Sequence, residues 1–361
     1  MKKVLHVITN FAAVGGAEMM LSRLIQTQPD CRHYVVALMN INGTYQDALQ
    51  RCEAHYALRW NGLNTLSAVL KLRKIIQAVQ PDVIQGWMYH ANVLASLSIT
   101  GLKNKPDIFW GIHHSLASPK DESASTKIAL ALSRVLAPQP AGIIYCAHSA
   151  LEQHRNFGLN NANSQVIANG VFTDKLRPNF KVNSPAVIGF AGRYHAAKGY
   201  PYLFEAMAKL KDEPVIFKIA GRGASLENPE VKALFEQHQL SADKVQLLGE
   251  VSDMPAFYQS IDAFSLTSIT EGFPNVLVEA MASGLPCITT DVGDAKYIVQ
   301  ELGWVAAPRD AAALAEAVLD YVNLTAAAKL ELKQQTRARV EQDFSIQQVS
   351  RQYLAAWRQQ A

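Results

Sequence analysis

Short apolar runs alternate with amphipathic helical patterns along the chain. Helical patterns such as residues 17–25 and 65–79 separate apolar runs that have the length and composition of strands. In the first half, these strand candidates are KVLHVIT (3–9), YVVALM (34–39), VIQGW (83–87), DIFWGIH (107–113) and GIIYCA (142–147). Strands buried on both faces read as apolar runs, and parallel strands need helical crossovers. The alternation therefore predicts a parallel sheet covered by helices.

The same alternation restarts after residue 180. The second set of strand candidates is AVIGFAG (186–192), VIFKIAG (215–221), VQLLG (245–249), AFSLTS (263–268) and PCITT (286–290). Residues 169–185 contain Asn-Gly and two prolines, which are typical of a linker. We therefore expect an α/β protein with two doubly wound Rossmann-like domains, residues 1–170 and 171–343, that face a central cleft. A helix over 344–361 is expected to pack back toward the first domain.

Composition and cysteine usage narrow the class of protein. The 361 residues are 49% hydrophobic and 18% charged, as in ordinary globular proteins. The four cysteines have no CxxC spacing, which argues against a disulfide framework and a structural zinc site. The apolar run after the N-terminal lysines is short and is broken by His6, and no run approaches the roughly 18 apolar residues of a membrane span. These features favour the cytoplasm, with the inner face of the plasma membrane as an alternative.

The net charge of +3 is unevenly distributed. Residues 1–170 contain 15 Lys and Arg against 9 Asp and Glu, whereas the rest of the chain has more acids than bases. This asymmetry favours an anionic partner of the first half, such as a phospholipid surface, a phosphorylated substrate or nucleic acid, although chance gives small imbalances too. Residues 70–79, LKLRKIIQAV, could lie on an anionic membrane as a basic amphipathic helix or face the core with a solvated edge.

Two loops carry signals for phosphate binding. Gly15 and Gly16 follow the first strand and precede a helix, where a close backbone approach and a helix N-terminus favour an anion. The alternative is a simple tight turn. GxGxxG is absent from the chain, because Leu226 stands where AGRG (220–223) would need its last glycine. Arg193 and Lys198 follow the first strand of the second half, and two cations there suit a diphosphate.

The stretch TEGFPNVLVEAMASGLP (270–286) places two acids around the start of an apolar helix. Glu271 lies in the loop before the helix, and Glu279 lies one turn inside it. The first helical amides have no intrahelical acceptor and form an anion site together with the helix dipole. Asn275, Glu279 and Ser283 fall on one polar stripe, from which a carboxylate could accept hydrogen bonds from a diol. The alternative is that both acids merely interact favourably with the helix N-terminus.

This stretch resembles the E-x7-E motif of the retaining glycosyltransferases of family 4, which have the two-domain GT-B fold. The GGAE turn, the central NGV, G-R-x4-K-G, AGRG and VGD follow in the order and spacing of that family. The resemblance implies that Arg193 and Lys198 hold the donor diphosphate, that the Val276 and Leu277 amides cap it, and that Glu279 binds the ribose. Glu271 would contact the donor sugar. The implied donor site also includes Gly15, Gly16, Gly221, Gly223, Val251, Gly272, Phe273, Pro274 and Asn275.

The family also has a histidine at the end of a strand in the first domain. Here the strand ends WGIHHS, so that His113 and His114 compete for this role, and His114 followed by a serine fits the family better. A structural hydrogen bond is the alternative for either histidine. We expect a glycan or lipid-diphosphate-linked glycan as acceptor, in surface polysaccharide biosynthesis. The residues expected to line the acceptor site are Trp87, Tyr89, His90 and Asn92.

The resemblance also favours sugar transfer over other classes of reaction. The donor is expected to be a UDP-sugar, carrying a hexose or N-acetylhexosamine, on family frequency alone. No DxD sequence occurs, so that no metal and no cofactor are expected, and nucleic acid is not expected as a partner. A sugar-nucleotide epimerase or a non-catalytic sugar-nucleotide-binding protein of the same fold is the alternative. A glycan phosphorylase and an NAD-dependent oxidoreductase lack their signatures here.

Overall fold

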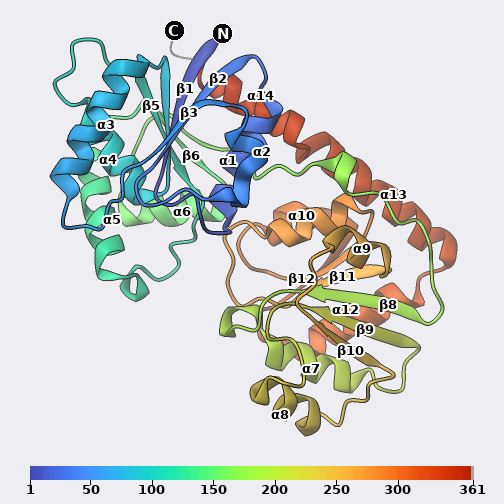
Figure 1. The fold of residues 1–361 in the computed structure, drawn as a ribbon. Helices are drawn as coiled ribbons and strands as arrows, with labels where there is room; N and C mark the ends of the chain where they lie inside the picture. Colours follow the sequence, from blue (N-terminus) through green and yellow to red (C-terminus); the bar gives the residue numbers. More distant parts are fainter. Residues whose placement is uncertain (359–361) are drawn as a thin grey trace. The chain divides into compact units, whose positions relative to one another are not determined.

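The computed structural model describes residues 1–358, which form two compact units with one parallel sheet each (Figure 1). Unit 1 comprises Met1–Gly170 and the C-terminal segment from Ile346 onward. Unit 2 comprises Val171–Ser345. The sequence led us to expect a boundary between residues 170 and 171 and a last helix from 344. The last helix, α14, begins at Ile346.

Unit 1 contains a seven-stranded sheet in the order β3-β2-β1-β4-β5-β6-β7. Its strands are β1 (Lys2–Ile8), β2 (Cys31–Ala37), β3 (Cys52–Ala57), β4 (Val83–Trp87), β5 (Asp107–Ile112), β6 (Gly142–Tyr145) and β7 (Ser164–Val166). Its α-helices are α1 (Gly16–Thr27), α2 (Gln46–Leu49), α3 (Thr65–Val79), α4 (Tyr89–Ile99), α5 (Ala124–Leu136), α6 (His148–Phe157) and α14 (Ile346–Ala356). The strand order reverses between β1 and β4, and such a switch point is where open α/β sheets bind ligands.

Unit 2 contains a six-stranded parallel sheet in the order β10-β9-β8-β11-β12-β13, whose switch point lies between β8 and β11. Its strands are β8 (Ala186–Ala191), β9 (Val215–Ala220), β10 (Val245–Gly249), β11 (Ala263–Leu266), β12 (Cys287–Thr290) and β13 (Gly303–Ala306). Its α-helices are α7 (Tyr200–Lys209), α8 (Pro229–Gln237), α9 (Met254–Gln259), α10 (Asn275–Ala282), α11 (Ala295–Val299), α12 (Ala311–Asn323) and α13 (Ala326–Asp343).

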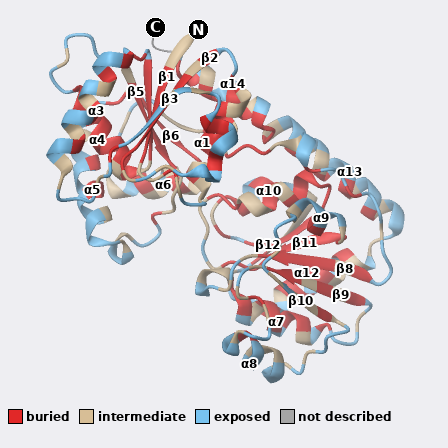
Figure 2. Cartoon of the chain, viewed as in Figure 1, coloured by how far each residue is buried: buried red, intermediate tan, exposed pale blue. Residues whose placement is uncertain are grey.

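The central strands of both sheets are buried on both faces (Figure 2). All five residues of β4 and all four residues of β11 and β12 are buried. This double-sided burial is the reason that the strands read as unbroken apolar runs in the sequence. The edge strand β3 differs, since none of its six residues is buried and four of them are exposed.

A chain of buried polar side chains crosses the core of unit 1. Trp87 Nε1 can only donate, so His6 Nδ1 accepts its hydrogen bond at 3.3 Å, and neutral His6 carries its proton on Nε2. His6 Nε2 therefore donates to His33 Nδ1 at 3.0 Å, and His33 Nε2 donates to the Gln28 carbonyl at 3.2 Å. Burial lowers the pKa of both histidines, that of His33 to about 4. The relay thus connects β4, β1 and β2 in a neutral state.

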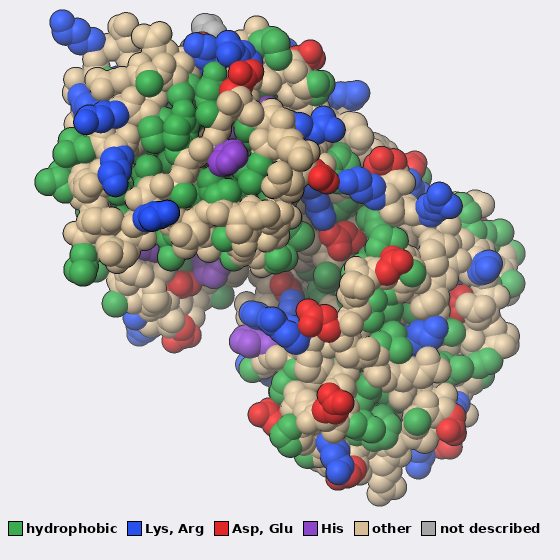
Figure 3. Space-filling model, in the orientation of Figure 1, with side chains coloured by type: hydrophobic (Ala, Val, Ile, Leu, Met, Phe, Trp, Pro, Cys, Tyr) green, Lys and Arg blue, Asp and Glu red, His purple; other side chains and the backbone are tan. Residues whose placement is uncertain are grey.

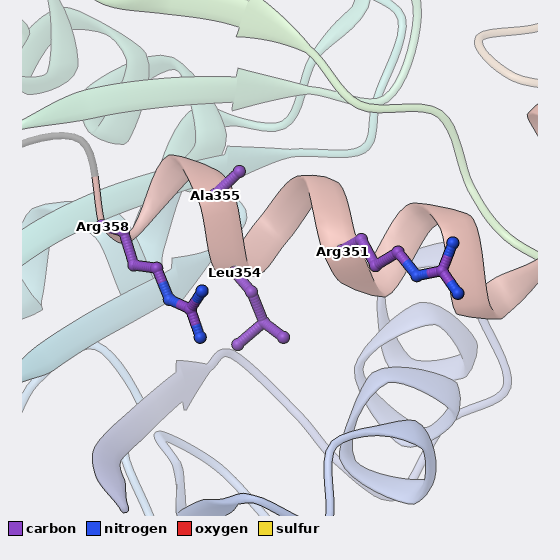
Figure 4. Close-up of a pocket in the computed structure, with 4 residues that line it drawn as sticks. All are labelled: Arg351, Leu354, Ala355 and Arg358. Carbon is purple, nitrogen blue, oxygen red and sulfur yellow. The ribbon is translucent and has the colours of Figure 1, made fainter.

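Helix α14 returns to unit 1 and packs against α1. Trp357, which follows it, is buried and donates from Nε1 to Gln85 Oε1 of β4 at 3.0 Å. The side of α14 shown in Figure 4 has a hollow of about 380 Å³, lined by Arg351, Leu354, Ala355 and Arg358. No helix within residues 1–358 is by itself long and apolar enough to span a membrane. The pair α12 and α13 meets the length and composition criteria only when taken together, and it bends by 111°.

Candidate active site

The switch point of unit 2 brings together two of the loops that the sequence singled out. Strands β8 and β11 are hydrogen-bonded neighbours, and both run parallel, so their carboxyl ends lie at the same edge of the sheet. The loop after β8 carries Arg193 and Lys198, and the loop after β11 carries Glu271. The order of the strands therefore explains why residues more than 70 positions apart in the sequence meet at one edge.

Lys198 and Glu271 form the central contact at this edge. Lys198 Nζ lies 2.6 Å from Glu271 Oε1, and the same oxygen accepts a hydrogen bond from Ser268 Oγ at 2.7 Å. The two charged side chains are largely shielded from solvent, with 23% and 15% of their surface exposed. Arg193, in contrast, is exposed, and no described side chain or carbonyl is in hydrogen-bond contact with its guanidinium. It can therefore turn toward an anion without breaking a contact.

The backbone around Lys198 fits only a glycine at position 199. Gly199 has a φ of +66°, and a Cβ there would collide with the Thr267 carbonyl of the neighbouring loop. Thr267 Oγ1 donates to the Lys198 carbonyl at 3.0 Å, and the Ile269 amide donates to the Ala197 carbonyl at 2.8 Å. These contacts join the two loops and fix the base of the Lys198 side chain next to Glu271.

The loop of Glu271 is held from the other side by residues after β12. Thr290 Oγ1 donates to the Ser268 carbonyl at 2.6 Å, and the Asp294 amide donates to the Gly272 carbonyl at 3.2 Å. Gly293 has a φ of +54°, and a side chain there would strike the carbonyls of Glu271 and Gly272. Our sequence analysis did not single out Ser268 and Thr290, although the LTS and ITT ends of the two strands contain them.

Helix α10 places Glu279 on its less buried side. Leu277, Val278, Ala280 and Met281 are buried and anchor the helix in the core, whereas Asn275 and Glu279 are half-buried. The Tyr258 hydroxyl lies 3.5 Å from Glu279 Oε2. One detail differs from the expectation that the Val276 and Leu277 amides are both free to cap phosphates.

The Leu277 amide donates to the Pro274 carbonyl at 3.0 Å, because the first turn of α10 is tight. Of these two amides, that of Val276 has no backbone acceptor among the described residues. Phe273, also predicted for the donor site, is 8% exposed and contacts the Phe344 ring within unit 2.

The AGRG loop lies beside the loop of Arg193. A Cβ on Gly221 would collide with the Gly192 carbonyl, and the Tyr194 amide donates to the Arg222 carbonyl at 2.8 Å. Gly223 has a φ of +81° and accepts a hydrogen bond from Asn228 at its carbonyl. Val251 lies two residues beyond the edge strand β10 and is half-buried. The glycines thus allow the close approach of two loops, whatever ligand these loops bind.

In unit 1, Gly15 and Gly16 begin α1 directly after the loop that follows β1. Gly15 is the N-cap residue, in extended conformation and without a side-chain cap. A Cβ on Gly15 would strike the Glu18 carboxylate, which therefore lies at the helix N-terminus itself. Burial raises the pKa of Glu18. An anionic ligand at this N-terminus would have to compete with Glu18.

The two candidate histidines have different surroundings. His113 stacks on Trp87 at 5.1 Å, and its Nδ1 lies 3.0 Å from Asn169 Oδ1, the asparagine of the NGV motif. Burial lowers the pKa of His113 to about 4, so that its ring is neutral. His114 is 42% exposed, and its Nε2 lies 2.7 Å from Glu122 Oε1. Sequence reasoning did not identify Glu122 or the His113–Asn169 contact.

Three of the four residues expected at the acceptor site are inside unit 1. The exposed fractions of Trp87, Tyr89 and Asn92 are 0%, 2% and 1%. Tyr89 contacts His154 through its hydroxyl at 2.7 Å, and Asn92 donates to the Gly111 carbonyl at 3.2 Å. Trp87 is the last residue of the buried strand β4, and Tyr89 and Asn92 are on the side of α4 that packs on the sheet.

His90, the fourth of these residues, is half-buried and lines a cavity. The acceptor prediction therefore needs correction for the other three side chains, which have almost no surface to offer a ligand. Among residues 1–358, no group of three or more His, Cys, Asp or Glu is placed to hold a metal ion.

Comparison with known sequences gives two family matches and a set of curated relatives. Residues 14–175 match the family described as Glycosyltransferase Family 4, and residues 185–323 match Glycosyl transferases group 1. The putative colanic acid biosynthesis glycosyltransferase WcaL of Escherichia coli (strain K12) is 30% identical over 186 residues, which cover 49% of this chain and 46% of WcaL. The Escherichia coli UDP-Gal:alpha-D-GlcNAc-diphosphoundecaprenol alpha-1,3-galactosyltransferase is 22% identical over 256 residues, covering 66% of this chain and 65% of that protein. The chain spans less than two thirds of the length of either relative.

Comparison with solved structures shows that the fold described above also occurs in other proteins, over almost the whole length of this chain. The structure of Anabaena HepE in complex with UDP superposes with a TM-score of 0.82 at 20% identity, covering 98% of this chain and 99% of HepE.

Proposed function

The chain belongs to the family 4 (group 1) glycosyltransferases and has their GT-B fold, and from this premise we propose that it transfers a sugar from a nucleotide diphosphate to a growing surface glycan. The proposed donor is a UDP-linked hexose or N-acetylhexosamine, transferred with retention of its anomeric configuration. The proposed acceptor is a glycan or lipid-diphosphate-linked glycan. The observation that carries this proposal is the Lys198–Glu271 pair at the β8/β11 switch point, one loop away from the N-terminus of α10.

The chemistry of sugar transfer matches the charges of these residues. The bond from the anomeric carbon to the diphosphate breaks, so that negative charge grows on the leaving diphosphate and positive charge grows on the sugar. Lys198, Arg193 and the Val276 amide would stabilise the departing diphosphate. Glu271 would lie near the sugar and stabilise the positive carbon, while Glu279 would accept hydrogen bonds from the ribose. The donor site needs no metal in this scheme, because cations of the protein neutralise the leaving group.

The choice of donor and acceptor rests on the relatives. HepE was solved with UDP, and the Escherichia coli galactosyltransferase is named for a UDP-sugar donor and a diphosphoundecaprenol-linked acceptor. WcaL is named for colanic acid biosynthesis. These names favour UDP and a lipid-linked glycan for this chain too. With a lipid-linked acceptor, the reaction would take place at a membrane surface, and we propose its cytoplasmic side as the site of action.

Thermal unfolding with a panel of UDP, GDP, ADP, CMP and NAD tests the donor site. A nucleotide at about 100 times its Kd adds about 2.7 kcal/mol to the free energy of unfolding, which raises Tm by several degrees. We expect a shift with UDP that EDTA leaves unchanged and that Arg193→Ala and Glu279→Ala abolish. Lys232→Ala, which removes an exposed cation on α8, is the matched control and should keep the shift. A shift with NAD alone, or with no nucleotide, would overturn the proposal.

A further inference from the structure

A cavity of about 460 Å³ lies in unit 1 beside α4, the helix that packs between α3 and α5. It is lined by the start of α3, by α4 and by α5, and it reaches the carboxyl ends of β1 and β2 at Thr9 and Met39. This edge of the sheet includes the β1/β4 switch point, where α/β sheets bind ligands. The volume is within the range of about 300–1,000 Å³ that is typical of small-molecule sites.

The lining of the cavity is mainly apolar. Its large apolar side chains are Met39, Trp60, Val93, Leu94, Ile128 and Leu132. A bound saccharide needs hydrogen-bond partners for most of its hydroxyls, because each unpaired buried polar group costs free energy. An aliphatic chain has no such requirement and gains from every methylene that it buries. The lining therefore favours a hydrocarbon chain over a sugar ring.

Exposed apolar residues continue from the cavity along the surface of α5 and α3. Ile128, Leu132 and Val135 fall at i, i+4 and i+7 on one stripe of α5 and are 64%, 44% and 75% exposed. Leu66 and Leu70 of α3 are 73% and 51% exposed. A soluble surface rarely leaves neighbouring apolar stripes uncovered, and such stripes mark sites of contact with apolar partners.

The charges around these stripes have one sign. Helices α3, α4 and α5 contain no Asp or Glu, and their cations are Lys71, Arg73, Lys74, Lys127 and Arg134. Figure 3 shows hydrophobic and basic side chains next to one another over this part of unit 1. None of these cations lines the cavity itself: Arg73 donates to the Thr100 carbonyl after α4, and Arg134 lies over the Phe157 ring, so they contribute a general positive field that attracts an anionic ligand to this part of the unit. They also account for much of the positive charge of the first half of the chain.

Two polar atoms among the lining residues lack partners. Thr9 Oγ1 and His90 Nε2 are buried, and no described group forms a hydrogen bond with either atom. The His90 ring lies against the Trp60 indole at 5.2 Å. A buried hydroxyl without a partner destabilises the folded protein, unless a ligand supplies the partner.

We propose that this cavity, lined by Trp60, His90, Leu94, Ile128 and Leu132, binds the isoprenyl or alkyl chain of a lipid-diphosphate-linked acceptor. The inference rests on the proposed function, since it names the part of unit 1 that holds the lipid of the acceptor. The chain displaces water from the apolar walls, and a polar atom near its head group pairs with Thr9 and His90. The glycan end of the acceptor remains outside the cavity.

Isothermal titration with monomeric farnesyl diphosphate tests the proposal in the full chain. Saturating UDP is present throughout, so that the diphosphate of the probe cannot occupy the donor site in unit 2. We expect farnesyl diphosphate to bind more tightly than geranyl diphosphate, because each buried methylene tightens binding about fourfold. Inorganic diphosphate alone should bind at least 100-fold more weakly. Equal affinities for the three probes would show that only the charge is recognised, and would overturn the proposal.

A matched pair of double variants locates the site. Ile128→Gln with Leu132→Gln changes two cavity residues, and Leu226→Gln with Leu248→Gln changes two exposed residues of unit 2 that do not line the cavity. All four side chains are exposed, so that neither variant should lose its fold. We expect the first variant to bind farnesyl diphosphate about tenfold more weakly or worse, and the second to bind like the wild type. Equal binding by the two variants would overturn the proposal.

The Thr9→Val variant tests whether the Thr9 hydroxyl binds the ligand or only stabilises the fold. Removing an unpartnered buried hydroxyl should leave Tm unchanged or raise it, while affinity for farnesyl diphosphate falls about two- to tenfold. A lower Tm with unchanged affinity would mean that the hydroxyl serves the fold alone. UDP-induced stabilisation is measured on every variant and should persist. If wild-type protein binds farnesyl diphosphate but not UDP, the proposed transferase function fails while the lipid cavity stands.

Discussion

Replacing Glu271 by Gln should tighten the binding of UDP while it slows sugar transfer. In the structure, Lys198 Nζ lies 2.6 Å from Glu271 Oε1. A phosphate oxygen that contacts the same ammonium group at about 2.8 Å can be at most about 5.4 Å from Oε1. A donor diphosphate on Lys198 therefore has to tolerate a carboxylate at close range, and the Gln variant removes this repulsion with little change of shape.

The size of the effect follows from Coulomb's law. Two unit charges 5.4 Å apart repel by about 3 kcal/mol at an effective dielectric constant of 20 and by about 0.8 kcal/mol in bulk water. The Glu271→Gln variant should therefore bind UDP about 4- to 180-fold more tightly. The same change should lower the free energy of unfolding by about 1–2 kcal/mol, because it weakens a partly shielded ion pair. It should lower kcat about 100-fold or more, since Glu271 would no longer stabilise the positive sugar carbon.

Isothermal titration with UDP, urea denaturation and the rate of UDP release from a UDP-sugar measure these three effects. Glu205→Gln is the matched control, because Glu205 pairs with Lys209 on the exposed surface of α7 in the same unit. The control should change none of the three quantities measurably. Unchanged or weaker UDP binding by Glu271→Gln would refute the reasoning, because it would mean that Lys198 does not contact the diphosphate.

Three further predictions concern the frame of the site and the histidines of unit 1. Gly199→Ala should lower the free energy of unfolding by at least about 1–2 kcal/mol in urea denaturation, because φ is positive there and the added Cβ would collide with the Thr267 carbonyl. Gly43→Ala should cost less, because the added Cβ would contact no other atom. The pKa of His33 is about 4 in the folded state against about 6.5 unfolded, so its contribution is complete above pH 6.5 and is lost as the pH falls toward 4, by about 2 kcal/mol at pH 5 in thermal denaturation. A pH-independent free energy of unfolding over that range would contradict the neutral relay. His114→Ala should reduce transfer at an unchanged Tm, whereas His113→Ala should lower Tm by removing a stacked, hydrogen-bonded ring, and the opposite pattern would exchange their roles.

The sequence predicted the central strands of both sheets and the edge strand β10, but not the other three edge strands. The apolar runs at 83–87 and 245–249 coincide with β4 and β10, and other runs differ from their strands by a few residues at the ends. β3, β7 and β13 were not expected. They lie at or next to the edge of a sheet, where one side meets solvent and the apolar pattern is lost. The order of the strands cannot be predicted from hydrophobic periodicity either, since it depends on which two strands each crossover helix connects.

Part of the candidate site could be predicted from the sequence. Arg193, Lys198 and Glu271 could be identified from the sequence because they are charged residues in the loops that follow apolar strands. The contact between Lys198 and Glu271 could not be predicted from the sequence, because it depends on β8 and β11 being neighbours in the sheet. Trp87 was expected at the acceptor site but is fully buried, since an aromatic residue at a strand end can point into the core as easily as into a ligand site. The partner of His114 could not be foreseen, because Glu122 lies in an irregular loop.

The burial of α10 explains how the loop that carries Glu271 can be rigid. Five apolar residues of the helix are in the core, so the start of the helix cannot move without opening a cavity, which typically costs several kcal/mol. Thr290 holds the Ser268 carbonyl, and Ser268 in turn donates to the carboxylate of Glu271. The position of the charge is thus determined by β12, a strand with no charged residue of its own. Changes in that buried strand should therefore alter the site as strongly as changes in the exposed loop, because the Thr290 hydroxyl holds the segment that carries Ser268.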